Sequence, residues 1–326
     1  MYYKTVIGNY PRQSWLRESL LKAEGKQKKS GATDLKVDLL YDKATLEVIR
    51  EFESLGLDII TDGQLRWTDS LASFCETLAG FKMTGLIRFY DNNFYYSQPE
   101  VNGKIVWKKP VYTADFLKAK KAAKKPLKWI LPGPYTLARL CKNSYYSNMD
   151  WLMADLSLAL SSEAEALSKA GCRILQIDEP SLVYDNTLKA ELPRIKEVLA
   201  KVESAFNGTT ILQTYFGSFN EAIADFLDLK FDVFGFDLVD GKNNMKFLKE
   251  HPVGRDVSLG VVNSRDILME KPQKIIKTLK TAAKYTESAN IHATPNWGLE
   301  LMPREYAVKK LSLLCKTVDS IKKDKK

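Results

Sequence analysis

The chain has 326 residues, 45% of them hydrophobic and 27% charged, proportions that are ordinary for a globular protein and ample for a large core. The formal net charge is +9, but the lysine-rich runs that carry much of it, such as 118–125, are not interleaved with aromatic residues and favour solvated helix faces over a nucleic-acid surface. No apolar run approaches the roughly 20 residues needed to cross a bilayer, and residues 1–11 lack the apolar core of a signal peptide, so we expect a cytoplasmic protein with no membrane partner.

Short apolar runs rich in β-branched residues recur along the whole chain. Each is too short for a typical helix and lacks strict alternation, which is typical of strands buried on both faces of a parallel sheet. In chain order the predicted strands are 4–8, 57–61, 128–132, 173–178, 210–215, 232–238, 256–262 and 290–294.

Longer amphipathic segments separate these runs and are predicted to be helices. Residues 43–56 repeat apolar side chains at helical spacing and end at Gly56, a usual C-cap residue. Residues 150–171 open with Asp150, a predicted N-cap, and 303–323 form another amphipathic segment with an apolar stripe.

Eight strand–helix alternations predict an α/β fold of the (β/α)8 TIM-barrel type, covering 1–320 as a single domain with a basic tail at 321–326. Residues 86–112 break the rhythm, because they are aromatic and contain the turn signals "DNN" and "NGK". We predict a β-hairpin insertion there, after the second βα unit. A doubly wound sheet is the alternative, but no G-x-G-x-x-G follows any strand.

Catalytic and binding groups of a (β/α)8 barrel gather where the strands end. The predicted catalytic residues are Asp178, Glu179 and Tyr215. Asp178 and Glu179 are adjacent at a strand end and point opposite ways, so one can face the cavity while the other anchors a loop. The remaining candidates suit a small ligand with an amine and a flat ring, although each has a structural reading as a loop cap, an ion-pair partner or a core residue. These substrate-binding candidates are Gly8, Asn9, Gln64, Arg66, Trp67, Asp178, Asp237, Asn263, Asn296 and Trp297.

Histidine and cysteine are scarce and scattered. His251 lies in an expected loop, and His292 lies mid-strand, where a core residue is the simpler reading than a catalytic base. The cysteines are not spaced as a zinc or disulfide framework. They are Cys75, Cys141, Cys172 and Cys315. No Ser-His-Asp or Cys-His arrangement and no phosphate-binding loop is readable.

Five motifs occur in order over nearly the whole chain, "TVIGNYPR", "GLDIITDGQLR", "LPGPYTLARL", "QIDEPSLV" and "SLGVVNSRD". Together they resemble the cobalamin-independent methionine synthase family. The resemblance implies a (β/α)8 barrel and methyl transfer to homocysteine from a methyltetrahydrofolate-type donor. In that family zinc binds the homocysteine thiolate and lowers its pKa.

The zinc ligands of the family are absent at the matching positions. The family's H-x-C falls on Tyr215-Phe216-Gly217, its later Cys falls on Trp297, and its acidic ligand falls near Asp237. One carboxylate cannot hold zinc tightly, so zinc and any other tightly bound cofactor are not expected. The motifs around these positions are similar to the zinc-free N-terminal barrel of full-length members, which helps bind the folate donor and its polyglutamate tail.

Amino-acid recognition is partly retained by the same resemblance. Ile7-Gly8-Asn9 matches the segment that holds the homocysteine carboxylate, and Asp178 matches one of two residues that hold its amine. The other amine-binding position, a Glu in the family, falls near Gln64, which loses a charge.

Three functions follow from these observations. The first is a zinc-free barrel that binds homocysteine or a methylfolate-like donor beside a separate zinc-bearing methionine synthase barrel, and whether this chain is an enzyme alone is left open. The second is a metal-independent alkyl transferase or lyase in which Tyr215, with a lowered pKa, acts with Asp178 and Glu179. The third, resting only on charge, is a basic nucleic-acid-binding protein.

Overall fold

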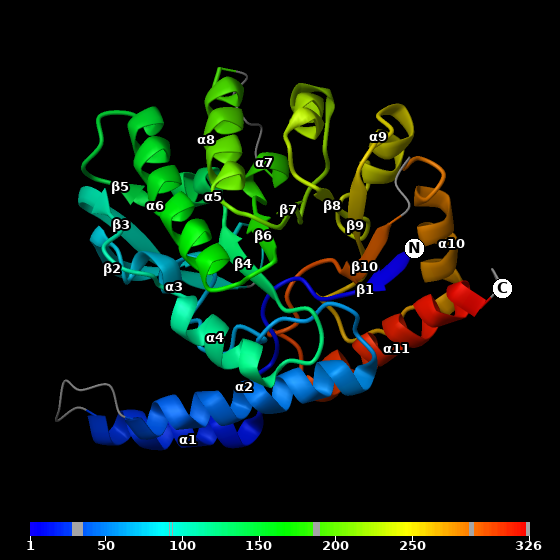
Figure 1. The fold of residues 1–326 in the computed structure, drawn as a ribbon, viewed down its shortest axis with the longest axis horizontal. Coiled ribbons are helices and arrows are strands. Elements are labelled where there is room, and N and C mark those ends of the chain that lie inside the picture. Colours follow the sequence, from blue (N-terminus) through cyan, green and yellow to red (C-terminus); the bar gives the residue numbers. More distant parts are fainter. Residues whose placement is uncertain (28–34, 91, 93, 185–189, 287–289, 324–326) are drawn as a thin grey trace.

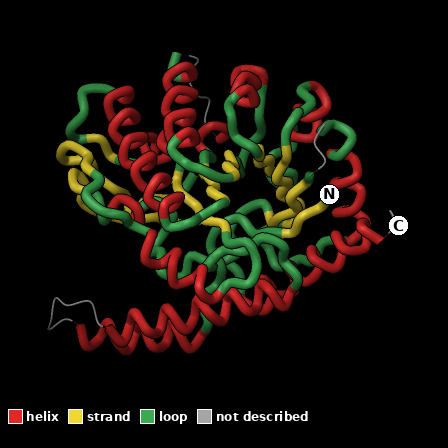
Figure 2. The backbone as a smooth tube through the Cα atoms, in the orientation of Figure 1, coloured by secondary structure: helices red, strands yellow, loops and turns green. Residues whose placement is uncertain are grey.

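A computed structural model describes residues 1–27, 35–90, 92, 94–184, 190–286 and 290–323. Seven strands form a curled parallel sheet in the order β1-β10-β9-β8-β7-β6-β4, with the helices outside it (Figures 1 and 2). The strands of this sheet are β1 (Tyr2–Lys4), β4 (Lys128–Pro132), β6 (Ile174–Asp178), β7 (Thr209–Gln213), β8 (Val233–Asp237), β9 (Asp256–Val262) and β10 (Ile291–Pro295). The predicted TIM-barrel class is confirmed.

The predicted strand 57–61 is wrong as a strand, although it occupies the expected place in the barrel. It forms only an isolated parallel bridge, between Ile60 and Leu127. The Asp58 N–H donates to the Lys4 carbonyl at 2.8 Å on one side, and the Lys128 N–H donates to the Ile60 carbonyl at 2.8 Å on the other. These few backbone bonds close the barrel between β1 and β4, but they are too few to form a regular ladder.

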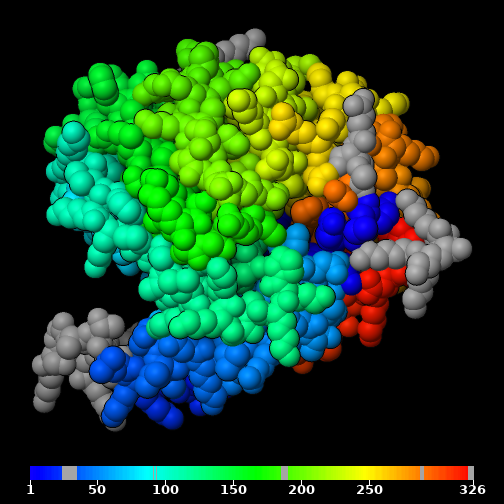
Figure 3. All heavy atoms as spheres, viewed as in Figure 1, coloured from blue at the N-terminus to red at the C-terminus, as the bar shows by residue number. Residues whose placement is uncertain are grey.

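The helices surround the sheet, and α1 and α2 lie side by side as a ridge along one edge of the molecule (Figures 1 and 3). After β7 a 3-10 helix replaces the α-helix of the usual repeat. The helices are α1 (Ser14–Gln27), α2 (Leu35–Leu55), α3 (Ala72–Cys75), α4 (Thr113–Ala122), α5 (Pro134–Leu140), α6 (Met149–Lys169), α7 (Ser181–Tyr184), α8 (Leu192–Ser204), η1 (Glu221–Asp228), α9 (Asn244–Glu250), α10 (Pro272–Ala282) and α11 (Arg304–Lys323).

Two predicted helix boundaries differ from the structure. The segment predicted over 43–56 begins earlier, because α2 starts at Leu35. In α6 the N-cap is Asn148, whose side chain accepts a hydrogen bond from the Trp151 N–H, whereas Asp150 lies in the first turn. Asn and Asp are both good caps, so the sequence pattern alone does not choose between them.

The insertion is an antiparallel pair, β2 (Ala79–Arg88) with β3 (Tyr95–Val106), in a separate sheet completed by β5 (Lys142–Asn143). The predicted range of 86–112 is therefore shifted, since pairing runs from Ala79↔Val106 to Arg88↔Tyr95. The turn signal "NGK" lies inside β3 and not at its end. It matches an irregular register where Gly80, with a φ of 91°, approaches the Lys104 carbonyl too closely to carry a Cβ.

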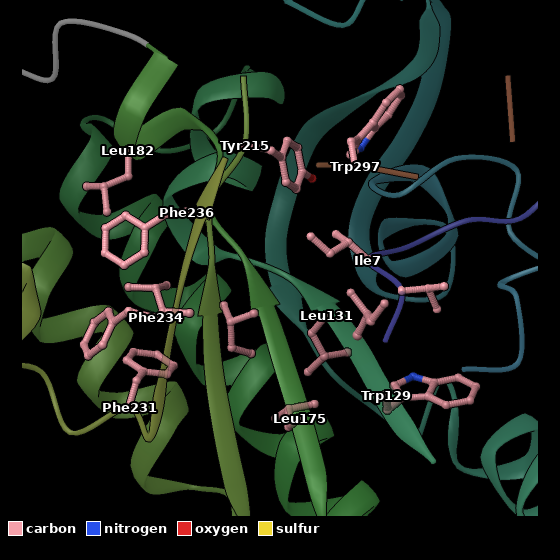
Figure 4. Packing of buried hydrophobic residues seen from close by; sticks show 14 of the residues in the cluster. Ile7, Trp129, Leu131, Leu175, Leu182, Tyr215, Phe231, Phe234, Phe236 and Trp297 are labelled. Atoms are coloured by element: carbon pink, nitrogen blue, oxygen red, sulfur yellow. The ribbon is translucent and has the colours of Figure 1, made fainter. Parts of the chain in front are cut away.

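The core fills the sheet interior and the space beneath the helices. Leu131 and Leu175 lie on adjacent strands, and Ile7 lies below Tyr215 and Trp297, which face each other at one end of the barrel (Figure 4). Consecutive residues of these strands are buried, so both faces of the sheet are covered, and this explains why apolar runs, and not alternating patterns, mark the strands in the sequence. None of the described helices is both long and apolar enough to cross a membrane.

Candidate functional site

Two adjoining cavities lie at the ends of the barrel strands. The smaller has a volume of about 10 Å³, roughly the room that one water molecule needs. The larger has a volume of about 490 Å³, in the range of small-molecule sites. Both cavities are lined by Asn9, Gln64, Trp67, Phe94 and Glu300. The smaller cavity is also lined by Gly8, Ser70, Asp178, Tyr215 and Trp297.

Asp178 supplies the carboxyl group of the smaller cavity. It ends β6 and is 7% exposed. Its Oδ1 accepts a hydrogen bond from Gln176 Nε2 at 2.6 Å, and its Oδ2 accepts one from the Tyr215 hydroxyl at 3.4 Å. Burial raises the pKa of Asp178 to about 7, against the lowering effect of Gln176 and of Lys128. The group can therefore hold or release a proton near neutral pH.

Lys128 lies beneath Asp178 inside the barrel. Its Nζ donates to the Val6 carbonyl at 2.7 Å and to Gln176 Oε1 at 2.6 Å. Gln176 thus connects the ammonium group to the carboxyl group of Asp178. Burial lowers the pKa of Lys128 to about 7, with Asp178 acting in the opposite direction. This buried chain fixes the orientation of Asp178 towards the cavity.

Gln64 is held in an unusual backbone conformation at the same place. It has a φ of 52° and is 4% exposed, and neither atom of its side-chain amide has a hydrogen-bond partner. The Asp62 carboxylate accepts a hydrogen bond from the Gln64 N–H at 2.9 Å, which stabilises the turn. A strained residue whose polar side chain is buried and unpaired marks a ligand site.

Gly8 and Asn9 also line the smaller cavity, next to Gln64. Gly8 has a φ of 86°, which favours glycine, and a Cβ there would lie 3.5 Å from the Gln64 Oε1. The Asn9 carbonyl accepts a hydrogen bond from the Leu299 N–H at 2.8 Å. The loop after β10 is thereby joined to the loop after β1, and this brings Glu300 into the site.

Glu300 is the site residue that sequence reasoning missed. Its Oε2 is buried without a hydrogen-bond partner, and burial raises the pKa of its carboxyl group to about 8. It lies five residues beyond the last residue of β10, farther from its strand than the residues predicted from the strand ends. The available signal was an acidic residue directly following "NWGL" in the last barrel loop.

Aromatic rings close the smaller cavity. Trp297 and Phe216 have ring centroids 4.9 Å apart, and Phe94 approaches Trp297 at 5.7 Å. Trp67 stacks on Tyr112 at 5.2 Å. Trp67, Tyr215 and Trp297 all line the smaller cavity. Figure 4 shows Tyr215 and Trp297 facing each other, with ring centroids 6.3 Å apart and ring planes tilted by 43°.

Glu179 does not face the cavity, so its predicted place among the reacting groups is not supported by its position. It is fully buried, and its carboxylate accepts hydrogen bonds from the backbone N–H groups of Tyr135, at 2.8 Å, and Thr136, at 3.0 Å. These are the first turn of α5, so Glu179 anchors that helix. Burial raises the pKa of Glu179 to about 8, against the lowering effect of these hydrogen bonds.

Tyr215 lies in the site, but the expectation of a lowered pKa is wrong. The side chain is buried, and its hydroxyl group lies against the Asp178 carboxyl group. Burial and the neighbouring Asp178 raise the pKa of Tyr215 well above its ordinary value. A phenol in this state holds its proton at neutral pH, which argues against Tyr215 as a general base.

Asp237, Asn296 and Asn263 are engaged in loop hydrogen bonds outside both cavities. Asp237 accepts from the backbone N–H groups of Phe216, Val239 and Asp240 at 2.8–3.0 Å. Asn296 Nδ2 donates to Asp237 Oδ2 at 3.2 Å. Asn263 Nδ2 donates to Asp266 at 2.6 Å. These three residues organise the loops, and their predicted contact with a ligand stays a prediction.

Arg66 is also placed away from the two cavities. Its guanidinium forms ion pairs with Asp38, Asp42 and Asp115 beside α2 and α4. Three carboxylates satisfy this cation, so the structural reading of Arg66 as an ion-pair partner holds.

The positions that match the family's zinc ligands do not fit a zinc ion. In the described ranges of the chain, no group of three or more His, Cys, Asp or Glu side chains is arranged so that it could hold a metal ion. A Cβ on Gly217 would lie 2.2 Å from the Val183 carbonyl oxygen, so a cysteine cannot occupy this position without a backbone shift. Trp297 fills the second position with a ring, and Tyr215 fills the third.

The curled parallel sheet and its helices define a TIM-barrel-like α/β protein. Residues 2–319 match the family model described as "Cobalamin-independent synthase, Catalytic domain". The chain therefore belongs to the cobalamin-independent methionine synthase family. The motifs around the zinc positions favour the family's N-terminal barrel, whereas the matching model describes the catalytic domain.

Individual proteins agree with this assignment. The methionine synthase of Sulfurisphaera tokodaii is 32% identical over 99% of this chain and 93% of its own length. That of Saccharolobus solfataricus is 29% identical, covering 94% of this chain and 91% of its own. A solved B12-independent methionine synthase from a Shewanella species, in complex with selenomethionine, has a TM-score of 0.84 at 19% identity, with 98% of both chains covered. The last comparison concerns the fold alone.

Proposed function

We propose that this chain takes part in homocysteine methylation as a barrel that binds substrates, while a separate zinc-bearing methionine synthase barrel activates the thiol. Family membership supplies the reaction class. The observation that carries the proposal is the closed position at Gly217, where any side chain would collide with the Val183 carbonyl group. A thiol bound here has no zinc ligand set to lower its pKa, so it stays protonated at neutral pH.

The larger cavity suits a methyltetrahydrofolate-type donor. Trp67 and Phe94 offer rings on which a flat heterocycle can stack. Arg12, Arg17 and Arg304 line the same cavity and suit the carboxylates of a glutamate tail. Aromatic and cationic groups in one cavity match the two chemical halves of such a donor.

The smaller cavity suits the amino-acid end of homocysteine or methionine. The Shewanella structure with selenomethionine supports an amino-acid ligand by analogy. Asp178 would accept the ammonium group, and Gly8 and Asn9 would face the carboxylate. A ligand of this size needs more than the present volume, so side chains that line the smaller cavity must move when it binds.

The proposal is tested with the purified chain alone and with a zinc-bearing barrel from the same cells. We expect far less than one zinc per chain by mass spectrometry of the metal content. We also expect no methionine from homocysteine and methyltetrahydrofolate with the chain alone, and methionine formation above the partner's own rate when both are present. Stoichiometric zinc together with turnover by the isolated chain contradicts the proposal.

A further inference from the structure

Glu300 lies at the junction of the two cavities and has no counter-charge. Its Oε2 is buried and unpartnered, and the carboxyl group folds back over Gly298, where a Cβ would lie 2.3 Å from Oε2. Glu300 forms no ion pair with any residue of the described chain. The buried Oε2 gains a partner only when a cation or a hydrogen-bond donor arrives.

Gln64 gives an independent indication that the junction holds a ligand. It is 4% exposed and lines both cavities, yet both atoms of its amide lack partners. Buried amides are nearly always hydrogen-bonded, and an exception at a cavity wall indicates a missing partner. The left-handed φ of 52° holds this amide in place at the expense of backbone strain.

We propose that Glu300 and Asp178 together bind the ammonium group of an α-amino acid, with the Gln64 amide as a third polar contact. The inference rests on the proposed function and assigns a residue to the amine of its amino-acid substrate. The family resemblance implies a carboxylate at the position of Gln64, which here is neutral. Glu300 restores the second negative charge from a different loop.

The charges around Glu300 support an oriented ligand. On the side of the smaller cavity Glu300 shares the space with Asp178 and Tyr215, and on the side of the larger cavity with three arginines. The titratable groups that line these cavities with Glu300 are Tyr10, Arg12, Arg17, Asp178, Tyr215 and Arg304. An ammonium group is attracted to the carboxyl side and repelled by the arginines, whereas an anionic donor is attracted to them.

Isothermal titration calorimetry with L-methionine and with its analogue lacking the amine, 4-(methylthio)butanoate, tests this assignment. Burial raises the pKa of Glu300 to about 8, so this group is largely protonated in the empty site at pH 7. Binding of an ammonium group favours the ionised form of Glu300, so the wild-type protein should release protons when L-methionine binds. Titrations in buffers of different ionisation enthalpy measure this proton release. Glu300→Gln should weaken L-methionine binding by about tenfold or more and reduce the proton release.

The control is Glu165→Gln, which removes an exposed carboxylate on α6 and should leave binding unchanged. The thermal transition of Glu300→Gln verifies that this near-isosteric variant folds. Equal affinity and equal proton release in Glu300→Gln and wild type overturn the assignment, while the proposed function stands. Equal weakening of both ligands overturns it too, because the amine is then not what Glu300 recognises. If the wild type binds no L-methionine, the assignment fails, and methionine formation with the partner barrel decides the proposed function separately.

Discussion

Asp178 and Glu179 are neighbours in the chain but have different surroundings. The side chain of Asp178 turns into the cavity, where its carboxyl oxygens accept hydrogen bonds from Gln176 and Tyr215. The side chain of Glu179 turns outward and meets the first turn of α5. Side chains alternate between the two faces at a strand end, so one of two adjacent residues faces the cavity and the other faces away. The sequence predicted that one carboxylate would line the cavity and the other would anchor a loop, but not which one.

Removing the Glu179 carboxylate should destabilise the barrel. In Glu179→Ala the backbone N–H groups of Tyr135 and Thr136 lose their acceptor in a fully buried place. Unpaired buried donors cost about 1–3 kcal/mol each, so we expect the free energy of unfolding to fall by about 2–4 kcal/mol. Urea denaturation measures this, with Glu203→Ala as the control on the exterior. A loss below about 0.5 kcal/mol would contradict the anchoring role.

His292 should make stability depend on pH. It is 5% exposed on β10, and burial, together with Lys128, lowers its pKa to about 4 from an ordinary value of 6.5. Above pH 6.5 the imidazole is neutral in both the folded and the unfolded chain and has no effect. As pH falls from 6.5 towards 4, the unfolded chain binds the proton first, so the free energy of unfolding decreases.

His292→Phe should remove this part of the acid sensitivity. At 1.36 kcal/mol for each pKa unit, the difference between variant and wild type should change by about 2–3 kcal/mol between pH 7 and pH 4. Denaturation at both pH values measures the difference, and His251→Phe, at a half-buried position on the far end of α9, is the control. A constant difference across this range would show that His292 is not held neutral by its surroundings.

At the scale of elements, the loop between β7 and η1 decides what chemistry the barrel can host. Its tip passes so close to the backbone at Val183 that only glycine fits at Gly217, and Phe216 takes a left-handed φ of 68° beside it. The loss of the family's zinc ligands is therefore built into backbone packing, and a change of side chains alone does not reverse it.

Gly217→Ala should lower the free energy of unfolding by about 1–3 kcal/mol, because the added methyl group forces a backbone shift. Gly85→Ala on β2 is the matched control, since a Cβ there meets nothing within 4 Å, and it should have almost no effect. Tyr215→His, Gly217→Cys and Trp297→Cys combined should likewise fail to bind zinc stoichiometrically. Tight zinc binding by that triple variant would show that the loop adapts more easily than its contacts indicate.

The sequence predicts elements best where the periodicity is strong. Six of the predicted strands coincide closely with strands of the barrel sheet, because buried parallel strands are read directly as apolar runs. The strand predicted at 4–8 shares only Lys4 with β1 (Tyr2–Lys4). The strand predicted at 57–61 is wrong because a strand also needs hydrogen bonds to neighbouring strands, and an apolar run in the sequence does not indicate whether these form. The place of Glu300 in the site is hard to predict for a similar reason. An acidic residue after "NWGL" is visible in the sequence, but the bond between Leu299 and Asn9, which joins the first and last loops, has no local signature.

At the scale of the whole molecule, the two ends of the chain together build the ligand site. Residues around Asn9 from the first loop and around Glu300 from the last loop line both cavities, and Arg304 begins the final helix. The Arg304 guanidinium donates to the Pro11 carbonyl at 2.6 Å and to Glu51 at 3.0 Å. Closure of the barrel is thus also assembly of the site, so variants that loosen these contacts should weaken ligand binding and stability together.

If the larger cavity binds a methyltetrahydrofolate-type donor, its affinity for that donor should depend on the charges that line the cavity. Arg17 is exposed on α1 and lines the larger cavity, while Arg12 is bound to the carbonyl groups of Leu65 and Trp67. Arg17→Ala should weaken binding of a triglutamyl methyltetrahydrofolate by about three- to tenfold. It should weaken binding of the monoglutamyl form by less, because that form has fewer carboxylates to contact the arginine. Raising the ionic strength should reduce the difference in affinity between the two forms, because salt screens exposed charges that lie more than about 8–10 Å apart.

Fluorescence titration of the buried tryptophans measures both affinities, and Arg50→Ala, exposed on α2 and outside the cavity, is the control. If tail length and salt have no influence on affinity, the arginines serve the fold and the donor lies elsewhere.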